Sequence, residues 1–102
     1  MPAYVIANVS VVDPARYEEY KNAVPPTIAA HGGRYLARGG SVHVLEGDWT
    51  PERLVVLEFP TAAQAKAWWD SIEYAVLKSI RQATARTQLV IVEGLAPPVS
   101  AS

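Results

Sequence analysis

Residues 3–12, AYVIANVSVV, combine β-branched side chains with a period of two, which is typical of a β-strand. One face of this strand would carry small apolar side chains: Ala3, Val5, Ala7, Val9 and Val11. The other face would carry Tyr4, Ile6, Asn8, Ser10 and Val12. A strand that faced bulk water on this second side would carry charged residues there. We therefore expect the second face to be covered by something other than solvent.

Helix signals follow this strand directly. Asp13 is a favourable N-cap, and Pro14 suits the first helical position, where no partner is needed for the missing N–H. The apolar stripe then recurs at helical spacing: Tyr17, Tyr20, Val24 and Ile28. Pro25-Pro26 predicts a kink or restart within this region, because proline breaks the hydrogen-bond ladder. His31-Gly32-Gly33 predicts the end of the helix.

Two segments of strand composition, residues 34–38 and 42–46, flank Gly39-Gly40. The glycines suit either a hairpin turn or a bulge within one bent strand, and we expect the bulge. Residues 47–51, GDWTP, predict the turn into the next strand, and Trp49 is expected to pack beneath it. Residues 53–59, RLVVLEF, are the most continuously apolar segment and predict a central strand.

A second helical region begins at Thr61, which forms a capping-box pattern with Gln64. Another helix, capped by Asp70 with Glu73, is expected to run to about residue 83. Its apolar stripe is expected to be Ile72, Val76 and Ile80. Residues 87–93, TQLVIVE, predict the last strand, and residues 96–102 a flexible C-terminal tail.

The order β-α-β-β-α-β matches the ferredoxin-like split motif of the α+β class. It predicts one domain, residues 1–95, with a four-stranded antiparallel sheet and two helical regions on one face. If alternation holds, the bare face would carry Ile6, Leu36, Leu45, Val56 and Ile91. A bare apolar face is an association surface. We therefore expect a homodimer through the open sheet face, with a barrel-like interior.

Composition excludes several classes of function. The 102-residue chain has a net charge of −1, which offers no strong field to nucleic acid or to an anionic membrane. It has no cysteine, and its two histidines, His31 and His43, lack the spacing of metal ligands. We expect neither a metal nor a cofactor. The N-terminus lacks the features of a signal peptide, so a cytoplasmic location is expected.

Glu58 is the most informative polar residue, because it interrupts an apolar strand and must be paired or protonated there. It is expected either to form a salt bridge with Arg38 or Arg34 across the sheet, Arg38 being preferred, or to serve a cavity as a general acid or base. Arg38 and His43 are the other catalytic candidates. Their alternatives are a strand-end arginine and an ordinary histidine.

The expected ligand-binding residues are Asn8, Arg38, Glu58, Trp68 and Tyr74. Core packing is the alternative for the two aromatic residues, and Trp68 and Trp69 cannot both face the core. Lys78 and Arg81 are expected on a solvated helix face. The alternative for Arg81 is that it closes a pocket with Tyr74.

Three patterns occur in order: DPxxYxxY from Asp13, GGRYLxRGG from Gly32 and EYxxxKxxR from Glu73. On these patterns, residues 3–95 resemble the family called domain of unknown function 1330. The resemblance implies a dimeric α+β barrel, a superfamily that includes cofactor-free monooxygenases, isomerases, haem-binding enzymes and proteins without known activity. A haem-binding protein would need a well-placed proximal histidine.

Three functions therefore stay open, of which a haem-binding protein with a proximal histidine is the third. The first is a cofactor-independent enzyme, monooxygenase- or isomerase-like, that acts on a small organic acid or aromatic molecule. The second is a non-catalytic dimer that binds a small molecule.

Overall fold

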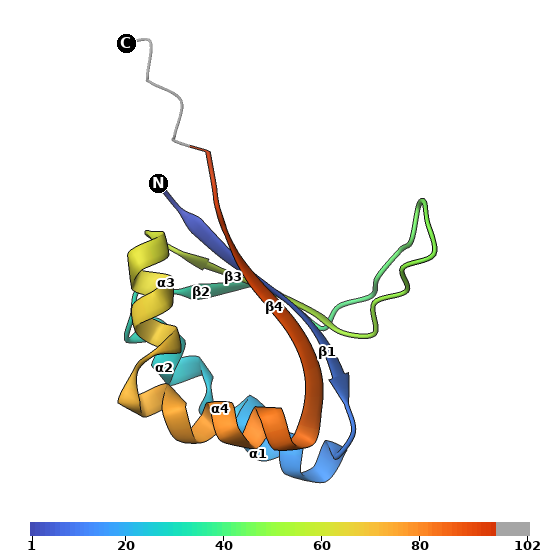
Figure 1. The fold of residues 1–102 in the computed structure, drawn as a ribbon, viewed down its shortest axis with the longest axis horizontal. Helices are drawn as coiled ribbons and strands as arrows, with labels where there is room; N and C mark the ends of the chain where they lie inside the picture. Colours follow the sequence, from blue (N-terminus) through green and yellow to red (C-terminus); the bar gives the residue numbers. More distant parts are fainter. Residues whose placement is uncertain (96–102) are drawn as a thin grey trace.

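The computed structural model describes residues 1–95, and the tail predicted at 96–102 lies outside them. Its four strands form one antiparallel sheet in the order β2-β3-β1-β4 (Figure 1). The strands are β1 (Ala3–Val11), β2 (Arg34–Arg38), β3 (Leu54–Phe59) and β4 (Ala85–Glu93). The helices are α1 (Pro14–Ala23), α2 (Pro25–Ala29), α3 (Ala62–Trp69) and α4 (Ile72–Thr84).

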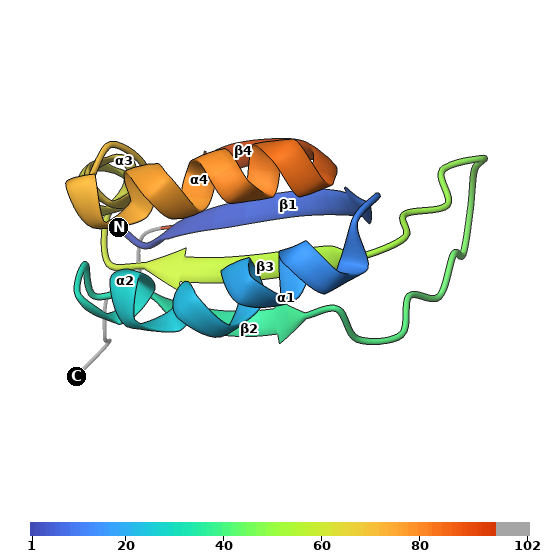
Figure 2. The same ribbon diagram turned by 90° about the horizontal axis from the view of Figure 1, so that it is seen from below.

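All four helices lie on one face of the sheet, as Figure 2 shows. The predicted ferredoxin-like α+β fold is therefore confirmed, with β3 and β1 as the central strands. None of the helices within residues 1–95 has the length and apolar character that a membrane span requires.

Alternation along the strands separates the two faces of the sheet. On β1 the side chains of Ala3, Val5, Ala7 and Val9 are buried beneath the helices, as predicted. Ile6 pairs with Val56, and both belong to the open face. Ile91 was expected there too, but it pairs with Val5 and packs against the core. The apolar residues of β4 on the open face are instead Val90 and Val92, which are 59% and 47% exposed.

The helix caps follow the sequence closely. Asp13 accepts a hydrogen bond from the Arg16 amide, and Thr61 accepts one from the Gln64 amide. The chain restarts at Pro25 as α2, as the two prolines predicted. The cap of α4 is Ser71 rather than Asp70, because Asp70 keeps helical geometry at the end of α3 while Ser71 is extended.

The buried stripe of α4 also differs from the prediction. Ile72 and Val76 are 88% and 68% exposed, whereas Ile80 is partly buried against the core, as predicted. The buried residues of the helix are Tyr74, Arg81 and Thr84. Both sets have helical spacing, and packing decides between them, because the Tyr74 ring stacks 4.1 Å from the ring of Trp68.

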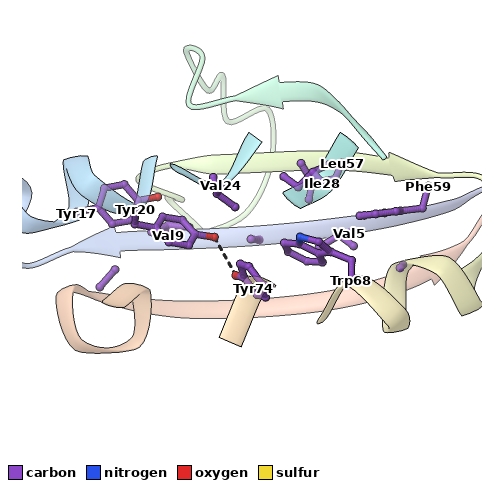
Figure 3. Close-up of a cluster of buried hydrophobic side chains, with 13 residues drawn as sticks. Val5, Val9, Tyr17, Tyr20, Val24, Ile28, Leu57, Phe59, Trp68 and Tyr74 are labelled. Carbon is purple, nitrogen blue, oxygen red and sulfur yellow. Dashed lines mark hydrogen bonds between the residues drawn. The ribbon is translucent and has the colours of Figure 1, made fainter. Parts of the chain in front are cut away.

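Aromatic packing joins the helices to the sheet (Figure 3). Trp68 lies between Tyr74 and Phe59, whose ring centroid is 5.6 Å away. Its indole N–H donates to the Thr27 hydroxyl at 3.1 Å, which ties α3 to α2. Trp68 is thus the inward residue of the tryptophan pair, and Trp69 is half-buried. Tyr17 and Tyr20 are buried in the same core, as predicted.

The strand predicted at residues 42–46 is wrong. Pairing of β2 with β3 ends at Arg38 opposite Val55, so the following residues have no strand beside them. Gly39 leaves the sheet with a φ of +69°, and residues 40–52, here called the arm, extend beyond the end of the sheet (Figure 2). Leu45 and Trp49 of the arm are 96% and 60% exposed, so neither the sheet-face position nor the packed tryptophan is observed.

A substitution at Gly33 tests how closely α2 packs against the sheet. A Cβ atom there would lie 2.6 Å from Cε1 of Phe59 and 2.7 Å from Cγ2 of Ile28, both buried. We expect Gly33→Ala to lower the free energy of unfolding by about 1–3 kcal/mol through overpacking. Gly40→Ala is the matched control, since nothing lies within 4 Å of its added Cβ. It should change stability by less than about 0.5 kcal/mol in urea unfolding. Equal effects would contradict the close packing at Gly33.

Candidate ligand-binding site

A cavity of about 40 Å³ lies between the sheet and the helices. That volume holds a few water molecules or a small charged group. Apolar residues of the strands and of α1 and α2 form most of its wall, together with Trp68. Its polar and charged lining residues are Tyr17, Tyr20, Lys21, Tyr35, Arg38, Arg53 and Arg81. The lining therefore contains four cations and neither a carboxylate nor an imidazole.

Arg81 is the most buried of these cations, with 5% of its surface exposed. Its Nε donates to the hydroxyl of Tyr74 at 3.2 Å. The Tyr74 hydroxyl in turn shares a 2.9 Å hydrogen bond with that of Tyr20, drawn as a dashed line in Figure 3. Two phenols carry two hydroxyl protons and this bond uses one of them. The pair therefore keeps one O–H that is free to donate.

Tyr20 and Tyr35 have raised pKa values at this site. Burial, followed by the neighbouring Tyr74, raises the pKa of Tyr20 far above its ordinary value. Burial also raises the pKa of Tyr35, and the nearby Arg38 opposes that effect only partly. Both hydroxyls therefore keep their protons at neutral pH, so neither is a phenolate base.

Arg53 and Arg38 enter the cavity from the base of the arm. The Nε of Arg53 is buried and has no hydrogen-bond partner among the described residues. Gly39 makes room for it, because an added Cβ at Gly39 would overlap the Arg53 guanidinium group. Arg38 donates to the carbonyl oxygen of Lys21, which joins β2 to α1, and its guanidinium carbon lies 4.7 Å above the Tyr35 ring.

The preferred pairing of Arg38 with Glu58 is wrong. Within residues 1–95 the ion pair observed is Arg34 Nε to Glu58 Oε1 at 2.9 Å, on the open face. A bulge between Tyr35 and Ala37 reverses the alternation of β2. Arg34 consequently stays opposite Glu58, whereas Arg38 comes opposite Val55 on the helix side.

The predicted site residues fall into three places. Arg38 and Trp68 line the cavity, whereas Tyr74 does not line it but hydrogen-bonds to Tyr20, which does. Asn8 and Glu58 belong to the open face, where Asn8 Oδ1 is buried without a partner in the described part of the chain. His43 is exposed on the arm. The structure does not bring these groups into one site, and their catalytic or binding roles stay predictions.

The solvated position expected for Arg81 is wrong, because Arg81 is buried, and its place beside the cavity with Tyr74 agrees with the alternative. Arg53 is not among the predicted site residues. The signal for Arg81 was its position seven residues after Tyr74, two helical turns along the same face. The signal for Arg53 was Gly39, whose missing side chain leaves space for the guanidinium group. His, Asp and Glu residues in the described part of the chain form no group of three that could hold a metal ion.

Solved structures with this arrangement share its fold. One is a protein of unknown function from Rhodopseudomonas palustris, with 19% identity, a TM-score of 0.76 and coverage of 94% of this chain and 84% of that one. A dimeric ferredoxin-like protein of unknown function from Jannaschia has 15% identity, a TM-score of 0.65 and coverage of 92% and 100%. SnoaB, a cofactor-independent oxygenase from Streptomyces nogalater, has 9% identity, a TM-score of 0.63 and coverage of 95% and 96%.

The fold and its neighbours define a ferredoxin-like α+β protein. The model of the family described as domain of unknown function (DUF1330) matches residues 2–95, and the chain belongs to that family. The resemblance seen in the sequence patterns is thus confirmed. No curated protein matches the chain.

The Arg34–Glu58 pair can be separated from Arg38 by double-mutant cycles. Arg34→Met and Glu58→Gln should couple by about 0.2–1 kcal/mol, because the pair is partly exposed to solvent. Arg38→Met and Glu58→Gln should be additive, since their side chains lie on opposite faces of the sheet. Urea unfolding of the single and double variants measures both cycles. Coupling confined to Arg38 would contradict the reversed alternation after the bulge.

High pH should destabilise the fold through Tyr20. The folded protein holds the Tyr20 proton, whereas the unfolded chain loses it above its ordinary pKa of 10.0. This contribution to stability is fully present below that pH and declines above it, by about 1.4 kcal/mol per pH unit. We expect Tyr20→Phe to be less stable than wild type at pH 7 and to lose less stability between pH 9.5 and 11. Urea unfolding at each pH measures this, and parallel pH profiles would contradict it.

Proposed function

We propose that this protein is a homodimer that binds a small organic acid, as its anion, in the cavity between sheet and helices. The observation that carries the proposal is Arg81. It is a buried cation beside a cavity, and no acidic residue pairs with it among residues 1–95. A buried charge without a counter-charge is unfavourable, and such groups gather at functional sites.

The other polar groups suit the same ligand. Arg53 offers a buried N–H that lacks an acceptor, and the Tyr20–Tyr74 pair has one free hydroxyl proton. Guanidinium and phenol donors directed at one oxygen group are what binds a carboxylate or an enolate. The apolar and aromatic walls, with Trp68 among them, suit a hydrocarbon or ring attached to that group.

The size of the cavity indicates which part of the ligand it would hold, namely the charged group. The cavity of about 40 Å³ accommodates a carboxylate but not a whole aromatic acid. Among its lining residues in the described part of the chain Arg38 is the exposed one, and its hydrogen bond to the Lys21 carbonyl oxygen joins β2 to α1 there. The body of the ligand would therefore occupy the side of the cavity near these two residues.

Binding is favoured over catalysis by side-chain chemistry. The polar lining residues are tyrosines and cations, without a carboxylate or an imidazole, and the raised pKa values of Tyr20 and Tyr35 keep both hydroxyls protonated at neutral pH. The lining therefore offers no ordinary general base. Glu58 and His43, the predicted acid or base candidates, lie away from it. The non-catalytic reading therefore has the better support, and turnover here would require a substrate that ionises by itself.

The open face supports the dimer. Val90 and Val92 are exposed there beside Ile6 and Val56, which makes a continuous apolar surface on the bare side of the sheet. The Jannaschia neighbour is described as dimeric, and a two-fold pairing of open faces would bury this surface in both copies.

Calorimetry with benzoate and benzamide tests the ligand class, because the two share a shape and differ in charge. We expect benzoate to bind at least tenfold more tightly than benzamide, since a charge-assisted hydrogen bond contributes about 1.5–3 kcal/mol. Butyrate and butyramide repeat the comparison without a ring. Equal affinity of acid and amide, or no heat from either acid up to millimolar concentration, would refute the anion site.

Arginine variants test whether benzoate binds in this cavity. Arg81→Met should weaken benzoate binding at least tenfold, and Arg53→Met should do the same at a position that disturbs the core less. Arg16→Met removes an exposed charge on α1 and should leave the affinity unchanged. If the Arg16 and Arg53 variants behave alike, the acid binds elsewhere.

A further inference from the structure

The arm has no support from the rest of its own chain. Every residue from 40 to 50 is exposed, and no backbone hydrogen bond connects residues 40–52 to any other described residue. Nevertheless it carries Val42, Val44, Leu45 and Trp49. Together with His43, Glu46, Pro51 and Leu54, these side chains line an open hollow of about 410 Å³. Exposed apolar residues gathered on one protruding segment are typical of a protein contact.

The direction of the arm indicates which surface of a second copy it would contact. In Figure 1 the helices lie on one side of the sheet and the arm rises on the other, beyond the sheet's end. A second copy packed on the open face would therefore lie beside the arm. Within its own chain the arm emerges between β2 and β3, and β1 separates β3 from β4. The 96% exposure of Leu45 shows that the arm does not fold back.

Strand β4 carries, on its open face, residues that are complementary to those of the arm. It is an edge strand, paired only with β1, and it presents Val90 and Val92 on the open face. Arg86 is exposed on the same strand, and its pairing with Ser10 assigns it to the open face. The arm's charged residues are all acidic: Glu46, Asp48 and Glu52. Apolar and electrostatic complementarity thus coincide on this strand.

We propose that the arm of each copy docks on the open face of β4 in a second copy of this chain. Val44 and Leu45 pack against Val90 and Val92 of the second copy, with the acidic residues of the arm near its Arg86. The two-fold relation makes the contact reciprocal, so each copy gives one arm and receives one. This inference rests on the proposed homodimer and is independent of the proposed ligand.

Cysteine cross-linking tests the contact, because the chain has no cysteine of its own. Leu45→Cys and Val90→Cys chains, co-expressed with different tags, should form a mixed disulfide-linked dimer under mild oxidation. Leu45→Cys with Ile72→Cys is the matched control, since Ile72 is 88% exposed on the helix side. We expect at least fivefold more linked product from the first pair. Equal yields, or equally efficient linking of Leu45→Cys with itself, would overturn the contact with β4.

Sedimentation velocity tests the energetic role of the arm. Leu45→Ser with Trp49→Ser should raise the dimer dissociation constant at least tenfold. Ile72→Ser with Val76→Ser removes two equally exposed apolar residues from α4 and should leave it unchanged. If wild type sediments as an 11.1 kDa monomer, the homodimer itself fails. If it is a dimer that responds equally to both double variants, only the docking of the arm fails.

Discussion

The packing of the Trp68 side chain is the interaction on which the rest of the structure depends. The Trp68 ring lies between Phe59 of the sheet and Tyr74 of α4, and its N–H donates to the hydroxyl of Thr27 in α2. One side chain thereby sets the position of three helical segments above the strands. It also holds Tyr74 where its hydroxyl meets Tyr20 and Arg81. The polar chain beside the cavity is thus a consequence of aromatic packing.

The two faces of the sheet have different chemistry. On the helix side, cations surround a small cavity and no acid neutralises them within the described residues. On the open side, Arg34 and Glu58 neutralise each other beside apolar residues. Side-chain alternation keeps the two sets apart across one layer of backbone. The first face is suited to an anion, and the second to another protein surface.

The base of the arm links the two faces. Arg38 and Arg53 stand at its two ends and enter the cavity, while the arm itself rises on the open side. Gly39 contributes to this arrangement in two ways. Its positive φ turns the chain out of the sheet, and its missing Cβ leaves room for the Arg53 side chain. Gly39 therefore affects both the direction in which the arm leaves the sheet and the position of the Arg53 guanidinium group.

The bulge in β2 shows why local patterns did not reveal the site. Arg34 and Arg38 are four residues apart and would share a face in a regular strand. The extra residue between Tyr35 and Ala37 reverses the side of Arg38, which the pairing with β3 decides. On α4, likewise, the stripe of Ile72 and the stripe of Tyr74 both have helical spacing. Only contact with Trp68 selects the second.

The sequence by itself determined the elements whose causes are local. The Asp13 and Thr61 caps, the restart at Pro25 and the alternation of β1 follow from neighbouring residues, as does the order that defines the fold. Only the tertiary structure decided that residues 42–46 lack a strand partner and that Arg81 is buried. The physical reason is that strand pairing and burial depend on residues far apart in the chain, which no local pattern contains.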